Sequence, residues 1–407
     1  DYIDPMFHKY VLGIDSCNLD SFFLPESELR DLLESRASQA ELSVIEGVMG
    51  FYDGIGGNSM AASTYEVAKI TNSPVILVVD GKGSSLSLAA QIKGFLDYQK
   101  DSHIRGVILN RTNPMVGERL RPEIEKLGVK YLGAVPVCET VDIKSRHLGL
   151  TMPEEQKDLR EHLAAFAGQL AKCLDVEGIL ELAGYYVGKN VKSARSAGIS
   201  MGEEKNTSGQ SELFGCKNKN LPDPGQTRIC VENDVCEIEN RMKPEKRIAV
   251  ALDEAFCFYY QENLNFLKEH GWEIVPFSPL HDTALPSFVQ AMLLGGGYPE
   301  LYAKELSENT SMLEAIRNAS KTGVRILAEC GGYISLEQNG AYRIKGHEFH
   351  YWDSTAPGDA FRANKPQSKR GWDCMYQTDR ILAGFPHLYY LSGPDLILNF
   401  LDGEETL

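Results

Sequence analysis

Short apolar runs alternate with segments of helical periodicity along the first third of the chain. The apolar runs are Leu42–Glu46, Pro74–Asp80, Gly106–Asn110 and Tyr131–Val135. Helical spacing of apolar residues is found over Ser85–Phe95 and Gly117–Leu127. Continuous apolar runs joined by amphipathic helices are typical of a parallel sheet that is covered on both faces. The pattern therefore predicts a doubly wound α/β domain whose ligands bind at the carboxyl ends of its strands.

The alternation stops in the middle of the chain and then resumes. Residues 189–245 are rich in Gly, Ser, Asn and Lys, a composition that favours low intrinsic order. From Arg247 onward, the strand-like runs RIAVALD, WEIVPFS, AMLLGGG and VRILAEC surround a helical pattern over Tyr259–His270. The sequence thus predicts two α/β domains, at residues 1–188 and 246–407, joined by a polar linker.

An apolar run leads directly into Cys330, which Gly331 and Gly332 follow. Because two glycines permit a tight turn, we expect a strand, a sharp turn and a helix that present the sulfur at the end of a sheet. Such a turn suits a nucleophile whose oxyanion is bound by the next backbone N–H group. A buried structural cysteine is the alternative, since free cysteines are among the most buried residues.

A cysteine nucleophile needs a base, and His347, His350 and His387 follow it in the chain. The spacing of His347 and His350 would suit a metal only on a helix, whereas their aromatic neighbours favour a strand or a pocket wall. Upstream, the glycine loop Gly295–Gly297 follows another strand. Its backbone N–H groups could bind an oxyanion, although an ordinary tight turn is the alternative.

Glu46 is the last residue of the first apolar run, and Asp53 follows a few residues later. An acid at a strand end beside a nucleotide is the usual place for a magnesium ligand. Two solvated loop carboxylates are the alternative. The same two interpretations apply to Asp1 and Asp4 in the opening motif DYIDP.

The composition argues against some classes of protein and indicates a cellular compartment. The chain has 407 residues, of which 41 are basic and 57 acidic, so that its net charge of −16 argues against non-specific binding to nucleic acid or an anionic membrane. No apolar run approaches the length that spans a membrane. The nine cysteines include no C-x-x-C pair. We therefore expect a reducing cytoplasm and neither a disulfide scaffold nor a zinc site.

The chain resembles the cobyrinic acid a,c-diamide synthase family in motifs that cover nearly all of it apart from the linker. They are DYIDPMFH, NLDSFF, IEGVMGFYDG, RHLGL, LLGGGYPELYAKELSEN, AECGG, GHEFHYWDS and HLYY. The resemblance implies a P-loop synthetase domain similar to dethiobiotin synthetase and a class I glutamine amidotransferase domain. It further implies amidation of the a and c acetates of cobyrinate in cobalamin biosynthesis, with ATP, Mg2+ and L-glutamine. A homodimer is compatible with this family.

The resemblance also implies roles in glutamine hydrolysis. Cys330 would attack the carboxamide of glutamine, form a glutamyl thioester and release ammonia. His387 would act as general base and acid. Gly297 and Gly331 would donate the N–H groups that bind the oxyanion.

The resemblance implies roles for residues of the synthetase domain as well. Glu46 would bind magnesium, and Asp1 and Asp53 would lie near ATP and the reacting carboxylate. Asn110 and Pro136 match positions that contact adenine in dethiobiotin-synthetase-like folds. The residues expected to meet the carboxylates of the tetrapyrrole are Arg146, His147, His347 and His350.

The chain departs from the family pattern in two places. It begins at Asp1, inside a motif that is internal in the family, so we expect the preceding strand and its G-x-x-x-x-G-K-[ST] phosphate loop to be missing and ATP binding to be poor. The connection from Cys330 to Gly346 is also shorter than usual. We therefore expect the second sheet to lack segments, with Ala341–Lys345 as an edge strand.

Two other functions stay open at this point. The same chemistry could act on nickel sirohydrochlorin, which carries similar acetate groups. A non-catalytic tetrapyrrole-binding protein, derived from the enzyme, would explain a missing phosphate loop. The retained Cys330 and His387 favour the enzyme.

Overall fold

The computed structural model describes residues 2–38, 40–138, 145–146, 149–150, 159–185, 246–329, 334–338, 342–348 and 354–403. These residues belong to one unit, formed by residues 1–185 and 244–407. Several predictions concern residues outside the described ranges, namely the linker at 189–245, Asp1, His147, Cys330, Gly331 and His350.

The first sheet has three parallel strands in the order β1-β2-β3. The strands are β1 (Val75–Asp80), β2 (Ile104–Asn110) and β3 (Lys130–Val135), and the helices between them are α4 (Ser87–Tyr98) and α5 (Pro114–Glu125). Each element matches an apolar run or a helical pattern in the sequence. Asp80 lies opposite Asn110, and Asn110 lies opposite Val135. The three strands therefore end at the same edge.

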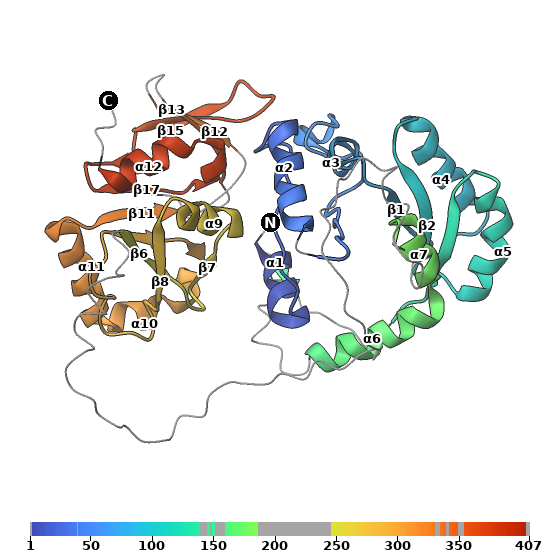
Figure 1. The fold of residues 1–407 in the computed structure, drawn as a ribbon, viewed down its shortest axis with the longest axis horizontal. Helices are drawn as coiled ribbons and strands as arrows, with labels where there is room; N and C mark the ends of the chain where they lie inside the picture. The colour runs from blue at the N-terminus through green and yellow to red at the C-terminus, as the bar shows by residue number, and fades with distance from the viewer. Residues whose placement is uncertain are drawn as a thin grey trace, which may run out of the picture. The chain divides into compact units, whose positions relative to one another are not determined.

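Helices cover both faces of this sheet (Figure 1). α5 packs through Gly117, where a β-carbon would lie 2.1 Å from the Tyr131 hydroxyl. On the opposite face, α7 (Val176–Leu182) packs through Leu182, which lies beside Leu132. Adjacent residues of a strand point to opposite faces, so the two helices sandwich β3. The predicted doubly wound parallel architecture is confirmed.

The predicted strand at Leu42–Glu46 is wrong. These residues form neither helix nor strand, and Val44 is 85% exposed. In the described part of the chain, no strand pairs with this run. An unpaired strand would leave its backbone polar groups without partners, so an apolar run alone does not produce one.

The second sheet has six strands in the order β16-β17-β11-β9-β6-β8. They are β6 (Lys246–Ala251), β8 (Trp272–Phe277), β9 (Ala291–Leu294), β11 (Arg325–Glu329), β16 (Tyr376–Gln377) and β17 (Ile381–Gly384). Neighbouring strands are parallel except for β16 with β17. The accompanying helices are α9 (Gln261–Glu269), α10 (Ala303–Glu308), α11 (Thr310–Thr322) and α12 (Pro394–Asp402). The strands and the helix predicted for this domain are confirmed.

A separate antiparallel sheet has the order β15-β14-β12-β13-β18. Its strands are β12 (Ile334–Gln338), β13 (Tyr342–His347), β14 (Phe361–Asn364), β15 (Gly371–Cys374) and β18 (His387–Leu388). The helix expected after Cys330 is wrong, because β12 pairs with both β13 and β14 and its backbone is used in these ladders. The piece expected as an edge strand, Ala341–Lys345, leads into β13: its described residues pair with β12, and β18 pairs with β13 only at Gly346 and His347.

One hydrophobic core is shared by the six-stranded and five-stranded sheets. Leu293 and Leu327 from the former belong to the same buried cluster as Leu336 and Ile344 from the latter, and each is 1% exposed. Phe400 of α12 belongs to it as well. The two sheets therefore share one buried cluster despite the short connection after Cys330.

The remaining elements lie outside the three sheets described so far. They are α1 (Ile3–Phe7), a π-helix (His8–Leu12), α2 (Glu26–Ala37), α3 (Thr64–Thr71), α6 (Leu159–Cys173), β4 (Ser145–Arg146), β5 (Gly149–Leu150), β7 (Phe256–Phe258), β10 (Gly296–Gly297), and the 3-10 turns η2 (Ile55–Gly57), η5 (Pro299–Tyr302) and η6 (Tyr390–Ser392). Among the helices of the described ranges, none has the length and apolar character needed to cross a membrane.

Candidate active site

The carboxyl ends of β9 and β11 meet at one edge of the six-stranded sheet. The two strands pair in register as far as Leu294 and Ala328, one residue before β11 ends at Glu329, so the glycine loop and the chain leaving Glu329 start from the same edge. Cys330 follows Glu329 directly, although Cys330 and Gly331 themselves lie outside the described residues. The glycine loop and the strand that leads into Cys330 are therefore neighbours.

The glycine loop requires glycine at Gly297. This residue has φ of 156°, and a β-carbon there would lie 2.1 Å from the Ala255 carbonyl oxygen. The same carbonyl accepts a hydrogen bond from the Tyr298 amide at 2.9 Å. Pro299 begins the following 3-10 turn. Glycine permits both the backbone angle and this close approach, as an oxyanion-binding loop would need.

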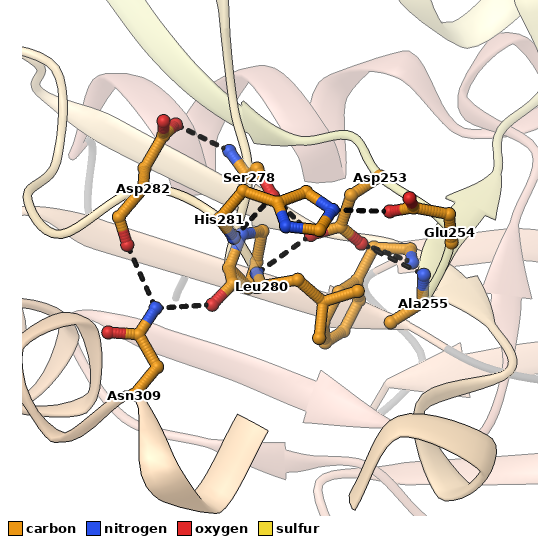
Figure 2. Close-up of polar contacts among 10 residues, drawn as sticks. Asp253, Glu254, Ala255, Ser278, Leu280, His281, Asp282 and Asn309 are labelled. Carbon is orange, nitrogen blue, oxygen red and sulfur yellow. Dashed lines mark hydrogen bonds and ion pairs between the residues drawn. The ribbon is translucent and has the colours of Figure 1, made fainter. Parts of the chain in front are cut away.

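A polar network fixes the turn between β6 and β7, against which the glycine loop packs (Figure 2). The carboxylate of Asp253 accepts hydrogen bonds from the amides of Ala255 and Phe256 at 2.9 and 3.0 Å. Its other oxygen accepts from the Ser278 hydroxyl at 2.8 Å and the Leu280 amide at 2.9 Å. A carboxylate with this many donors is held in one orientation, so the turn is a firm support for the loop.

His387 lies in β18, opposite His347 of β13, and is 4% exposed. Asn263 of α9 holds the strand, because its Nδ2 donates to the Leu388 carbonyl at 2.7 Å and its Oδ1 accepts from the Tyr390 amide at 2.9 Å. Burial, and then the charge of His347, lower the pKa of His387 to about 3. Its imidazole is therefore neutral near pH 7 and able to accept a proton.

Glu329, to which the sequence pattern assigned no role, is 9% exposed at the end of β11. Burial raises the pKa of its carboxyl to about 8, against smaller lowering effects of hydrogen bonds from the Tyr390 hydroxyl and the Leu388 amide. The acid is visible in the motif AECGG, but its burial is not. That burial depends on β18 and η6, which lie far along the chain.

The ring of Tyr2, from the opening motif, lies beside the histidine and packs against further aromatic rings. The ring of Tyr2 lies 5.0 Å from that of His387 and 6.3 Å from that of His347, measured between centroids. Tyr2 also contacts Phe258 at 5.3 Å and Tyr260 at 4.6 Å. These rings exclude water around His387, in agreement with its lowered pKa.

The edge of the three-stranded sheet brings together the two residues that the family resemblance assigned to adenine. Asn110 ends β2 opposite Val135, which Pro136 follows. At the same edge, the Arg111 Nε donates to Asp80 Oδ1 at 2.8 Å, and this hydrogen bond lowers the pKa of the Asp80 carboxyl. The ion pair was not predicted, since it depends on the register between β1 and β2.

Glu46 lies beside the opening motif. Its Oε2 is 3.1 Å from the His8 Nε2, and its charge, after burial, raises the pKa of the Asp4 carboxyl. Asp53 is exposed in the same loop, where its amide donates to the Gly50 carbonyl at 2.9 Å. Within the described ranges, no group of three or more His, Cys, Asp or Glu residues is placed to hold a metal ion. The neighbouring carboxylates of Glu46 and Asp4 nevertheless fit Mg2+, because this ion usually takes one or two carboxylates together with phosphate oxygens.

The residues expected to contact the tetrapyrrole are only partly described. The backbone of Arg146 pairs with Gly149 in the short β4–β5 ladder. His347 faces the aromatic cluster of Tyr2, and burial lowers its pKa to about 4. His147 and His350 lie outside the described residues.

Two family models match the chain. The CobB/CobQ-like glutamine amidotransferase domain matches residues 247–341, and an AAA domain matches residues 25–145. The first range begins at the second residue of β6 and runs past β12, and the second contains β1 to β3. A solved structure described as a GMP synthase protein of Thermoplasma acidophilum covers 39% of this chain and 93% of its own, at 17% identity and a TM-score of 0.26. That score is too low to bear on the fold.

Relatives named cobyrinate a,c-diamide synthase match almost the whole chain. The protein of Caldanaerobacter subterraneus is 34% identical over 99% of this chain and 89% of its own length. The protein of Salmonella typhimurium is 34% identical over 98% of this chain and 89% of its own length. The protein of Methanococcus maripaludis is 36% identical over 83% of this chain and 67% of its own length. The first alignment runs over 451 positions, so this relative carries residues that the 407-residue chain lacks. The chain belongs to the cobyrinate a,c-diamide synthase family of glutamine-dependent amidating ligases.

Proposed function

We propose that this protein amidates the a and c acetate carboxylates of cobyrinate, in cobalamin biosynthesis, with ammonia from glutamine and activation by ATP. The observation that carries the proposal is the buried, neutral His387 in the same domain as the glycine loop and the strand that leads into Cys330. The family names of the relatives support the substrate. We retain domain boundaries at residues 1–188 and 246–407 as part of this proposal.

Glutamine hydrolysis would use this edge of the six-stranded sheet. His387 takes the proton of the Cys330 thiol, and the thiolate attacks the carboxamide carbon of glutamine. The N–H groups of Gly297 and Gly331 stabilise the oxyanion. His387 then returns the proton to the leaving ammonia, and water, activated by the same imidazole, hydrolyses the glutamyl thioester to glutamate and free Cys330.

The acetate would be activated at the edge of the three-stranded sheet. Asn110 and Pro136 would bind adenine, and Asp1 and Asp53 would act near the phosphates and the reacting carboxylate. The carboxylate takes the terminal phosphoryl group of ATP to form an acyl phosphate, and ammonia displaces the phosphate to leave the amide. Glu46, near Asp4, would hold Mg2+, which supplies charge neutralisation of the phosphates.

The tetrapyrrole would be bound through its several carboxylates. Arg146 suits these groups because its guanidinium binds a carboxylate through two hydrogen bonds. His147, His347 and His350 complete the proposed contacts. The described cysteines are free thiols, which supports the cytoplasm as the compartment. We retain a homodimer as the assembly to be tested.

The first test separates the two half-reactions with Cys330→Ala. Glutamine-dependent amidation of cobyrinate should be abolished, whereas amidation supported by ammonium chloride should be retained, because only the glutaminase half needs the thiol. Glutamate release and amide formation are measured in parallel, with Cys374→Ala as a buried-cysteine control that keeps both. Equal loss of both activities in Cys330→Ala would refute the assigned role. Turnover of nickel sirohydrochlorin in place of cobyrinate would change the substrate but keep the chemistry.

A further inference from the structure

The hydroxyl of Tyr259 joins two strands at the point where the glycine loop begins. It donates a hydrogen bond to the Ala251 carbonyl and accepts one from the Gly295 amide at 2.9 Å. Ala251 is the last residue of β6, and Gly295 directly follows the last residue of β9. Burial raises the pKa of the Tyr259 hydroxyl well above its usual value, so it stays neutral and can both donate and accept. One side chain therefore links the ends of the two strands.

This link lies where the ladder between β6 and β9 ends. The two strands are parallel, and their register runs as far as the pair of Val250 and Leu293. Beyond that pair, the Tyr259 hydroxyl connects the two backbones through two successive hydrogen bonds. Two such bonds span a wider gap than one direct bond does. Tyr259 thus sets the distance from β6 at which the chain leaves β9.

The ring of Tyr259 also packs directly on Gly295. A β-carbon at Gly295 would lie 2.4 Å from the Cε1 atom of the ring and 2.5 Å from its Cζ atom. Glycine permits this close approach because it has no β-carbon. Ring packing and hydrogen bonding therefore act on the same residue, the first of the loop.

The far end of the loop has supports of its own. Gly296 pairs with Phe258 of β7, and the Tyr298 amide donates to the Ala255 carbonyl at 2.9 Å. Three successive glycines have little stiffness of their own, because glycine has the widest choice of backbone angles. The position of the loop therefore depends on what its neighbours hold, and Tyr259 holds its start.

We propose that Tyr259 is a positioning residue of the glutaminase: its hydroxyl sets where Gly295 leaves β9 and so aims the loop that carries Gly297. This role rests on the proposed function, in which the Gly297 amide stabilises the oxyanion. Such a donor must be held in place before the reaction, since it acts on charge that develops only in the transition state. Tyr259 acts through Gly295 and not by contact with glutamine.

The test removes only the hydroxyl, with Tyr259→Phe in the full chain. The ring stays but both hydrogen bonds are lost, so the loop should shift and kcat for glutamine hydrolysis should fall about 100-fold. KM for glutamine should stay near the wild-type value, because the lost stabilisation belongs to the transition state. Ammonia-dependent amidation should be unchanged. Full glutaminase activity would overturn the proposal, as would a raised KM with unchanged kcat.

Tyr342→Phe is the matched control. It removes a hydroxyl that accepts a hydrogen bond from the Asn399 Nδ2 at 2.9 Å, between β13 and α12 of the same domain. This variant should keep the wild-type kcat for glutamine hydrolysis. Equal losses of kcat in the two variants would indicate general damage to the domain and would overturn the proposal.

Alkylation of Cys330 by iodoacetamide separates the loop from the nucleophile. The reaction needs the thiolate but forms no oxyanion, so its rate should be the same in Tyr259→Phe and wild type. The rate is measured by mass spectrometry of the peptide that contains Cys330. Slower alkylation in Tyr259→Phe would place the defect at the thiol and would contradict a role through the loop.

Hydrogen exchange gives a readout that does not depend on glutaminase activity. The Gly295 amide loses its acceptor in Tyr259→Phe, so exchange in the peptide that contains it should be faster there and unchanged in Tyr342→Phe. Equal exchange in wild type and Tyr259→Phe would overturn the link between the hydroxyl and the loop. If wild type released no glutamate while the exchange difference held, the proposed function and the positioning role would fail, and the structural link would stand.

Discussion

At the scale of single residues, the chemistry of this site is controlled by burial. His387 and Glu329 are both almost completely buried, and burial shifts the pKa of each toward its neutral form. Family resemblance could identify His387 because the motif HLYY is local. It could not show that the pKa of the Glu329 carboxyl is raised, because the environment of this side chain includes residues about sixty positions away in sequence.

Replacing His387 with Ala should reproduce the effect of removing the nucleophile. Glutamine-dependent amidation should fall by roughly 100-fold or more, whereas ammonia-dependent amidation should remain, because the imidazole moves protons only in the glutaminase half. The exposed His281→Ala serves as control. In wild type, the acidic limb of kcat/KM for glutamine should lie well below pH 6.5, since His387 becomes protonated only near pH 3. An acidic limb near 6.5 would contradict the buried, neutral imidazole.

At the scale of elements, apolar runs located strands well wherever a neighbouring strand was available. β1, β2, β3, β6, β8, β9 and β11 all coincide with predicted runs. Leu42–Glu46 does not form a strand, because no strand of the described ranges pairs with it. The segment of β12 was predicted as a helix, because the two ladders that make it a strand join residues distant in sequence. Local pattern thus determines which segments suit a strand, but long-range pairing decides which of them form one.

The link between α9 and the histidine strand predicts a strong effect of Asn263→Ala. The substitution leaves the Leu388 carbonyl and the Tyr390 amide without their partner, and each buried unpaired group costs about 1–3 kcal/mol. Glutaminase activity and the thermal midpoint should therefore fall together. Asn265→Ala, two residues along the same helix, should change either quantity little. Normal activity in Asn263→Ala would mean that β18 is held in place without this side chain.

At the scale of the whole molecule, the two proposed half-reactions use different sheets. Of the residues proposed for the glutaminase, His387 lies in the five-stranded sheet and Gly297 in the two-stranded β10-β7 sheet, whereas Asn110 and Pro136, proposed to bind adenine, lie at the end of the three-stranded sheet. The family models match these two regions separately. Substitutions should accordingly fall into two classes: those that affect only glutamine as the nitrogen source, and those that affect ammonia as well.

Glu46→Gln should belong to the second class. If this carboxylate holds the metal near the phosphates, its loss should impair amidation from glutamine and from ammonia by similar factors, because both need the acyl phosphate. Glutamate release without ATP should be unaffected. Glu41→Gln, at an exposed acid of the same loop, is the control. Normal ammonia-dependent turnover in Glu46→Gln would exclude Glu46 from the activation step.

The shared core of the two sheets in the C-terminal half has a consequence for partial unfolding. Leu293 and Leu327 on one sheet and Leu336 and Ile344 on the other are buried against a common cluster, so neither sheet can open without exposing apolar surface of its neighbour. Elements joined in this way open as one cooperative unit. The strand that leads into the nucleophile and the strand that bears the histidine are then lost together. Cys330 and His387, the proposed catalytic pair, should persist intact until the whole unit melts.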